Sequence, residues 1–152
     1  MSVIDRLYTA FAAGDAAAMG ACYAEDARFR DPAFGELNAE EVRAMWRMLL
    51  GRSKDLRITF TVLHADEVSG TCEWHAHYTF ASTGRKVHNI IRSEFKLRDG
   101  LIVEQRDRFN FWRWSRQSLG ASGWLLGWTP FVQGKVRRAA LAALDKHLRQ
   151  GA

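Results

Sequence analysis

The chain has 152 residues, of which 47% are hydrophobic, and this balance excludes wholesale disorder while allowing one domain with a proper core. No apolar run approaches the roughly 18 residues that a membrane span needs. The net charge of +5 comes from the C-terminal part, because seven Lys/Arg and one acid follow residue 112, whereas 15 basic and 16 acidic residues precede it. The main body therefore lacks the basic stripe expected of a nucleic-acid-binding protein, and we expect no nucleic-acid partner.

The first part of the chain has the pattern of two helices. Apolar residues at helical spacing predict a helix over residues 3–13, followed by Gly14 as a C-terminal cap. Asp15 is a suitable N-cap for a second, Ala-rich helix over residues 16–24. The apolar stripe of the first helix consists of Ile4, Leu7, Tyr8 and Phe11.

A short strand and a third helix follow. Residues 27–31 alternate between apolar and polar side chains, and Pro32 stops further strand pairing. Asn38 and Glu41 have the spacing of a capping box, which predicts a helix that reaches about Leu50.

From residue 55 onward the apolar side chains recur at every second position, which predicts strands. We expect four antiparallel strands, over residues 58–62, 71–80, 87–97 and 101–112. Helices, a short strand, a helix and then four strands indicate an α+β domain, with helices packed on one face of a curved antiparallel sheet.

Asp31 is the first candidate functional residue. It lies at the end of the short strand, directly before Pro32. One interpretation is a turn carboxylate that caps local amides. The other is a pocket carboxylate, in which case burial beside Phe29, Trp46 and Phe109 should raise its pKa toward neutrality.

Asp107 is the second candidate, because it shares the parity of Phe109 and Phe111 in the last expected strand. A carboxylate on the apolar face of a strand is costly unless it has a use. Pairing with Arg106 or Arg108 is the alternative, but neighbours along a strand point to the opposite face. We therefore expect Asp31 and Asp107 to converge on one acidic pocket with apolar walls.

Three histidines raise the question of a metal site. His75, His77 and His88 should lie near one another on adjacent strands, on the face that also carries Glu73 and Thr79. That face is the outer, convex side of the sheet, and no carboxylate or cysteine pattern completes a zinc site. We expect no metal, and a polar face that is solvated or buried in a homodimer.

At this point the chain resembles a known family. Tyr-Ala-Glu-Asp-Ala at residues 23–27, Asp31-Pro32 and the Asp99-Gly100 hairpin are similar to the SnoaL-like branch of the nuclear transport factor 2-like superfamily, over roughly residues 3–112. Ketosteroid isomerase and limonene epoxide hydrolase are better-known relatives. The resemblance implies a cone, in which a bent sheet wraps round helices and leaves a ligand pocket at the open end. It does not imply one activity, because the fold hosts enzymes and binding modules alike.

The resemblance also implies roles for single residues. Asp31 matches the general base of ketosteroid isomerases, whereas their oxyanion tyrosine aligns near Leu7 and their protonated aspartate aligns with Ser93. Tyr8 lies one place off, and we expect it on a different helical face. Both oxyanion donors are thus expected to be lost, which argues against ketosteroid isomerase activity. Asp107 matches an acidic position on the last strand of SnoaL-like cyclases.

These considerations predict an acid/base enzyme of isomerase, cyclase or hydrolase type, acting without a cofactor on a small, mostly apolar carbonyl compound such as a polyketide or steroid. Asp31 would abstract a proton, Asp107 would act as acid or orient a water, and Tyr78, Asn89 or Ser93 would bind the developing oxyanion. The alternative is a non-catalytic ligand-binding or dimerisation module. The expected pocket lining is Leu7, Phe11, Phe29, Trp46, Trp74, Tyr78, Asn89, Ser93, Gln105 and Phe109.

Residues 113–152 form an extension to the cone domain of residues 1–112. The extension is rich in tryptophan and ends in a basic amphipathic helix over about residues 132–149. We expect it to pack on the same domain as a lid over the cone mouth. Burial against a second subunit is an alternative, and membrane docking is the least favoured, since the same tryptophans serve packing equally well. The charged first residues lack a secretory signal, and Cys22 and Cys72 suit a reducing compartment, so we expect a cytoplasmic protein.

Overall fold

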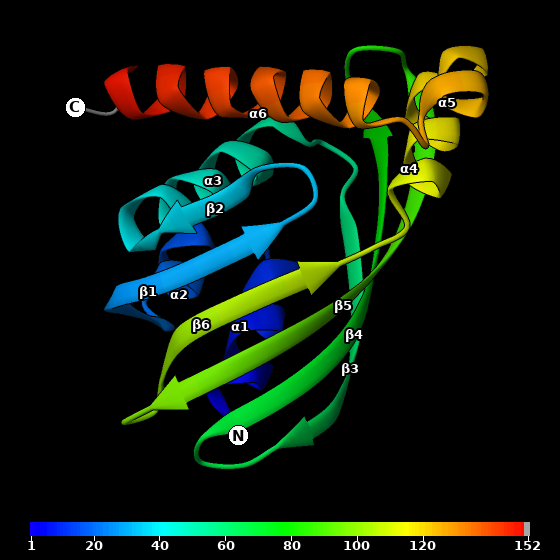
Figure 1. Ribbon diagram of the computed structural model, residues 1–152. Coiled ribbons are helices and arrows are strands. Elements are labelled where there is room, and N and C mark those ends of the chain that lie inside the picture. The colour runs from blue at the N-terminus through cyan, green and yellow to red at the C-terminus, as the bar shows by residue number, and fades with distance from the viewer. Residues whose placement is uncertain (151–152) are drawn as a thin grey trace.

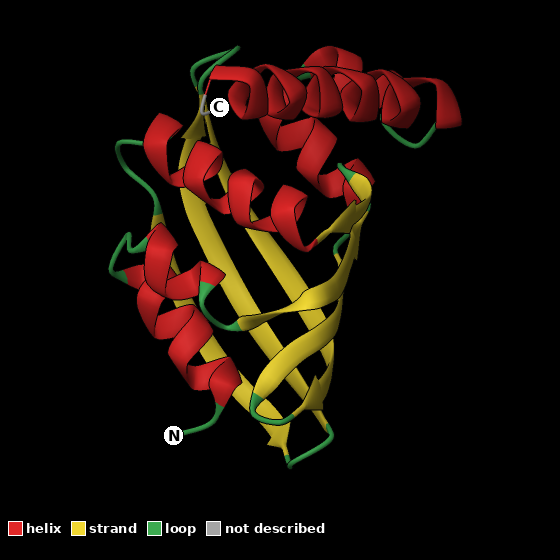
Figure 2. Ribbon diagram, turned by 90° about the vertical axis from the view of Figure 1, so that its left-hand side faces the viewer, coloured by secondary structure: helices red, strands yellow, loops and turns green. Residues whose placement is uncertain are grey.

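The computed structural model of the protein describes residues 1–150 (Figure 1). The chain forms an α+β domain, as predicted, in which helices lie along one side of a bent mixed sheet (Figure 2). The elements in chain order are α1 (Val3–Ala12), α2 (Ala16–Gly20), β1 (Tyr23–Asp31), β2 (Gly35–Asn38), α3 (Ala39–Arg52), β3 (Arg57–Ala65), β4 (Ser69–Phe80), β5 (Arg85–Arg98), β6 (Leu101–Arg108), α4 (Phe111–Leu119), α5 (Ala121–Leu126) and α6 (Pro130–Gln150).

The six strands lie in the order β2-β1-β6-β5-β4-β3. β3 to β6 form the predicted antiparallel meander, whereas β1 pairs in parallel with β6. Strand β2 was not predicted, because its four residues bury only Leu37 and carry no clear alternation. β1 also begins earlier than expected, at Tyr23, since a register shift before Arg28 interrupts its alternation.

The predicted cap of α3 is confirmed and fixes where that helix starts. Asn38 Oδ1 accepts a hydrogen bond from the Glu41 amide at 2.9 Å, and the Glu41 carboxylate accepts one from the Asn38 amide at 3.0 Å. Satisfying these end groups anchors the helix directly after β2. Val42, Met45 and Trp46 then point into the core, where they are almost fully buried.

The last strand is shorter than predicted. β6 ends at Arg108, and Asn110 caps α4 by accepting a hydrogen bond from the Arg113 amide at 3.0 Å. Phe111 therefore begins a helix, so the predicted strand up to residue 112 is wrong. The aromatic residues after Arg108 are compatible with a strand or a helix. The Asn110 cap stabilises the start of a helix at Phe111.

Helix α6 lies across the broad end of the domain, above α3 and β2 in Figure 1. Leu144 is only 2% exposed and belongs to the main core, while Val132 and Val136 pack on a second cluster with Phe111 and Trp114. The end of the chain thus covers the side of the cone where β1 ends. Within residues 1–150, none of the helices has both the length and the apolar character required to cross a bilayer.

Candidate functional site

Asp107 is the centre of a buried hydrogen-bonded network. Its side chain is 4% exposed, and its Oδ1 accepts two hydrogen bonds, from Ser93 Oγ at 2.5 Å and from Gln105 Nε2 at 2.9 Å. Ser93 on β5 stands directly opposite Asp107 in the β5–β6 register, and Gln105 precedes Asp107 by two positions on the same face. The meander itself therefore assembles this group.

Ser93 is held in turn by two further donors. Tyr8 Oη from α1 and Trp74 Nε1 from β4 each donate to Ser93 Oγ at 2.8 Å. A hydroxyl has one hydrogen and two lone pairs, so all three hydrogen-bonding positions of Ser93 are used. The hydrogen of Ser93 is thus committed to Asp107 and is not available to a ligand oxyanion, which was one of the roles expected for it.

The position of Tyr8 corrects a prediction. Tyr8 was expected on a different helical face from the pocket, but it is 1% exposed and its hydroxyl reaches Ser93. The signal was present in the sequence, because Tyr8 belongs to the apolar stripe of α1 together with Leu7. Burial and the charge of Asp107 raise the pKa of Tyr8 well above its usual value, so the hydroxyl stays protonated.

Tyr23 supports the network from the other side, and sequence reasoning did not identify it as a site residue. Its hydroxyl donates to Gln105 Oε1 at 2.5 Å and accepts a hydrogen bond from Trp46 Nε1 at 3.0 Å. Trp46 comes from α3 and Tyr23 from the start of β1. Side chains from α1, α3, β1, β4, β5 and β6 thus converge on one carboxyl group.

Asp31 has the role of the turn carboxylate in the first of the two interpretations. Its Oδ1 caps the following turn by accepting hydrogen bonds from the amides of Ala33 at 3.0 Å and Phe34 at 2.5 Å. Burial nevertheless raises the pKa of Asp31 to about 6, against the lowering effect of those amides and of the Arg137 guanidinium. The Asp31 carboxylate therefore caps the turn and also titrates near neutrality.

The two carboxyl groups interact. Burial raises the pKa of Asp107 to about 7, the hydrogen bonds from Ser93 and Gln105 oppose that shift, and the charge of Asp31 adds to it. The structure therefore brings the two predicted acidic residues within electrostatic range of each other. The partners that hold the Asp107 carboxyl are both neutral, and Arg106 and Arg108 are exposed on the opposite face, as predicted.

The other predicted lining residues fall into two groups. Leu7, Phe11, Phe29, Trp46 and Trp74 are buried in the main core, where Phe11 contacts both tryptophan rings at centroid distances of 5.0 and 5.3 Å. Tyr78, Asn89 and Phe109 are only partly buried.

Tyr78 and Phe109 lie between the two apolar clusters, and Tyr78 Oη accepts a hydrogen bond from Trp114 Nε1 at 2.8 Å. Asn89 is paired with Ala76 on β4. The apolar wall predicted round the carboxyls is thus formed mainly by residues of α1, α3, β1 and β4.

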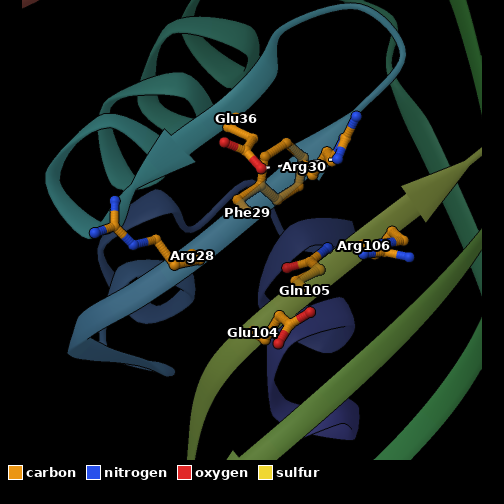
Figure 3. A pocket seen from close by; sticks show the side chains of 7 residues that line it. All are labelled: Arg28, Phe29, Arg30, Glu36, Glu104, Gln105 and Arg106. Atoms are coloured by element: carbon orange, nitrogen blue, oxygen red, sulfur yellow. Dashed lines mark ion pairs between the residues drawn. The ribbon is translucent and has the colours of Figure 1, made fainter.

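Two surface hollows lie among residues 1–150 near these elements, and the linings of both leave out Asp31 and Asp107. The first, of about 290 Å³, lies where β2, β1 and β6 meet; its charged side chains project outward, while Phe29 and Gln105 point inward (Figure 3). The second, of about 220 Å³, lies between α3 and α6. The first hollow is lined by Arg28, Phe29, Arg30, Glu36, Glu104, Gln105 and Arg106.

The histidines lie on the outer side of the sheet, as expected. His77 pairs with His88 in the β4–β5 register, their rings stack at 4.1 Å, and His75 Nδ1 is 2.8 Å from His88 Nε2. Partial burial and the two neighbouring imidazoles lower the pKa of His88. Within residues 1–150, no group of three or more His, Cys, Asp or Glu side chains has the arrangement of a metal site.

Arg137 of α6 connects the C-terminal helix to the Asp31 turn. Its guanidinium donates to the Pro32 carbonyl at 3.3 Å, and its charge lowers the pKa of Asp31. We expect Arg137→Met to raise the pKa of Asp31 further above about 6, since an opposite charge near the carboxylate is removed. Arg138→Met, at the exposed neighbouring position, is the matched control. Carboxyl ¹³C NMR titration checks this, and equal shifts in both variants would contradict it.

Comparisons with known proteins agree with this geometry. The model of the SnoaL-like domain family matches residues 4–105. The chain belongs to the SnoaL-like family. No curated protein matches this SnoaL-like chain. Among solved structures, a proposed polyketide cyclase from Silicibacter sp. is similar with 24% identity and a TM-score of 0.67, over 76% of this chain and 91% of that one.

Two further solved structures share the fold. A ketosteroid isomerase-like protein from Catenulispora acidiphila, in complex with trimethylamine, is 16% identical with a TM-score of 0.67, over 84% of this chain and 97% of that one. An epoxide hydrolase from M. tuberculosis, of limonene epoxide hydrolase type, is 17% identical with a TM-score of 0.61, over 77% of this chain and 86% of that one. At these identities the likeness establishes the cone fold and leaves activity to be argued from the site.

Proposed function

We propose that this SnoaL-like protein is a cofactor-independent acid/base enzyme that moves protons on a small, mostly apolar carbonyl compound of polyketide or steroid type. The observation that carries the proposal is Asp107, a carboxyl that is buried among aromatic side chains and held by two neutral donors. With a pKa of about 7 it exists in both protonation states at neutral pH. A group of this kind can give or take a proton during turnover.

Asp31 and Asp107 would have different roles. Asp31, with a pKa of about 6, is mostly ionised at pH 7 and suits the base that takes a C–H proton next to the substrate carbonyl. The electron pair of that C–H bond moves to form the enolate, and the carbonyl oxygen gains negative charge. Both hydrogen bonds to Asp107 end on Oδ1, so the proton of its acid form belongs on Oδ2. Asp107 Oδ2–H would then donate to the enolate oxygen.

In this scheme Asp107 Oδ2–H takes the place of the two oxyanion donors that the sequence lacks at the expected positions. Ser93 and Gln105 act as positioning residues, because they fix which oxygen of Asp107 carries the proton. Return of the proton at another carbon gives an isomer. Attack of the enolate carbon on a second carbonyl gives a cyclised product. Proton transfer of this kind needs no organic cofactor.

Access to the carboxyls would require α6 to move. Gln133 and Arg137 of α6 both donate to the Pro32 carbonyl, at 3.5 and 3.3 Å, and Leu144 anchors the other half of the helix in the core. We therefore assign to α6 the role of a lid over the Asp31 side of the cone. Small apolar compounds would enter when these contacts open.

A non-catalytic ligand-binding or dimerisation module of the same fold is the competing function. It is favoured by one observation, namely that Asp31 Oδ1 is already used by the Ala33 and Phe34 amides while α6 covers the interior. In that case the two carboxyls would serve structure alone.

Hydrogen–deuterium exchange at carbon separates the two functions. We expect the protein to accelerate exchange of α-protons in D₂O for at least one member of a panel of cyclic ketones, β-diketones and steroid ketones, read by ¹H NMR. Binding of each compound is measured in parallel by calorimetry. Compounds that bind without any accelerated exchange would refute the enzyme and support the binding module.

We further propose a homodimer through the convex sheet face and a cytoplasmic location. The histidine group on that face is only partly buried within one chain, and the lowered pKa of His88 leaves that one imidazole neutral at pH 7 and available to an interface. Cys22 and Cys72 are both free and buried, which suits a reducing compartment.

A further inference from the structure

Helix α5 is turned with its small residues inward and its large residues outward. A Cβ at Gly123 would lie 1.9 Å from the Ser115 carbonyl oxygen, and one at Gly127 would lie 2.6 Å from Ser115 Cβ. The backbone of α5 therefore lies directly on α4, with no room for a side chain between them. This contact forces the bulky residues of α5 to the opposite side, which is solvent.

The result is an exposed group of apolar side chains, which we call the aromatic corner. Each member is between 49% and 73% exposed, although large apolar residues of a lone surface helix normally face the core. Figure 1 shows α5 and the start of α6 at one upper corner of the domain, next to α4. The members are Trp124, Leu125, Leu126, Trp128 and Phe131. The expectation that these tryptophans serve packing is therefore wrong for Trp124 and Trp128.

The aromatic corner is held in place by defined contacts. The Arg116 guanidinium lies 4.1 Å from the Trp112 ring centre and 4.7 Å from that of Trp124, and Trp112 Nε1 donates to the Trp124 carbonyl at 3.2 Å. Helix α4 is itself tied to the β4–β5 turn, where Arg85 Nε donates to the Gln117 carbonyl at 2.8 Å. The exposed side chains are therefore presented by a supported structure.

The segment that carries the aromatic corner has charges of one sign. Residues 109–144 contain five Lys/Arg and no Asp or Glu. Lys135 and Arg138 follow Phe131 by four and seven positions on α6, and all three are exposed. That spacing places them on one face of a helix, so the cations continue the surface that Phe131 begins.

We propose that the aromatic corner docks on an anionic lipid surface. Tryptophan side chains favour the boundary between headgroups and acyl chains, and adjacent Lys and Arg side chains are attracted by anionic headgroups. A second copy of the chain fits less well, because a two-fold contact through this corner would bring cations of one sign together. A flat lipid surface also accommodates a protruding corner without needing a matching groove.

Docking would place α6 beside the bilayer, and this consequence rests on the proposed function. The same helix that begins at the corner reaches the Asp31 turn through Gln133 and Arg137. A mostly apolar substrate partitions into lipid and would reach the lid from there. The docking itself needs no turnover, so its test can fail or succeed independently of the proposed chemistry.

Vesicle co-sedimentation of the full chain tests the docking. We expect binding to vesicles of equimolar phosphatidylcholine and phosphatidylglycerol, a blue shift of tryptophan fluorescence, and weaker binding as salt is raised. The double variant L125S/W128S should weaken vesicle binding by at least about tenfold, because two exposed apolar anchors are removed. Lys135→Gln with Arg138→Gln should weaken binding to the anionic vesicles and leave binding to pure phosphatidylcholine unchanged.

The matched control is L63S/V68S. Leu63 and Val68 are 48% and 68% exposed, and they lie near the β3–β4 turn at the other end of β4. This variant should bind vesicles like the unchanged protein. The proposal is overturned if the unchanged protein does not bind anionic vesicles at low salt, or if L125S/W128S binds as well as the control. It is also overturned if L125S/W128S abolishes a dimer, measured by sedimentation equilibrium, without changing vesicle binding.

Discussion

Asp107→Asn is expected to make the folded protein more stable at pH 8, by up to about 4 kcal/mol. The pKa of Asp107 is raised from 3.8 to about 7, and each unit corresponds to about 1.4 kcal/mol. The native state thus holds this proton more tightly than the unfolded chain does. Stability is fully present below pH ~4 and is lost as the pH rises through ~7, where the buried carboxyl must ionise. Asparagine removes that penalty, and its Oδ1 can still accept from Ser93 and Gln105.

Urea unfolding at pH 4 and pH 8 measures this effect. The unchanged protein should lose stability between the two pH values, and Asp107→Asn should show a much flatter dependence. Asp99→Asn is the matched control, because Asp99 is exposed in the β5–β6 turn with a φ of 53°, a conformation that asparagine also adopts. Equal pH dependence of stability in the unchanged protein and in Asp107→Asn would mean that the pKa of Asp107 is not raised in the folded state.

Asp31→Asn is expected to lower the rate of α-proton exchange by roughly 10²–10⁴-fold, the usual contribution of a positioned general base. Asparagine retains an oxygen that can accept from the Ala33 and Phe34 amides, so the turn after β1 should persist. The loss would therefore report on the missing base and not on a collapsed loop. Circular dichroism and thermal unfolding of the variant verify that the fold is kept.

The pH profile of the unchanged protein provides a second measure of the same roles. The exchange rate should rise through pH ~6 as Asp31 ionises and fall above pH ~7 as Asp107 loses its proton. Asp31→Asn should abolish the rising limb. Full activity of Asp31→Asn, or a profile that stays flat between pH 5 and pH 8, would assign the chemistry to other groups.

Local sequence patterns predicted most of the fold because each one reports on a single element. Asn38 with Glu41 located the start of α3, and the alternation of β4 and β5 placed His77 beside His88. The same parity rule put Asp107 on the inner face and its arginine neighbours outside. These inferences needed no knowledge of what packs against the element.

The missed features depend on contacts between distant segments. Tyr23 became a site residue because β1 pairs in parallel with β6 and brings its hydroxyl to Gln105, and no periodicity in residues 23–31 reveals that partner. The outward orientation of α5 depends on its glycines meeting Ser115 of another helix. The sequence shows the glycines and tryptophans, but only the packed structure shows which side each faces.

The hydrogen bonds round Asp107 all run toward its Oδ1, and this limits the routes by which its proton can exchange with solvent. The chains of hydrogen bonds that start at Trp46 and Trp74 both end on Oδ1, and indole N–H groups cannot pass protons on. Tyr8 and Tyr23 are almost fully buried, and burial raises the pKa of both, so their hydroxyls stay protonated and out of reach of solvent. The shell that orients the acid therefore also insulates it, so isotope from solvent reaches Asp107 only through Oδ2. A molecule bound at Oδ2 would therefore prevent exchange of the Asp107 proton with solvent until that molecule leaves.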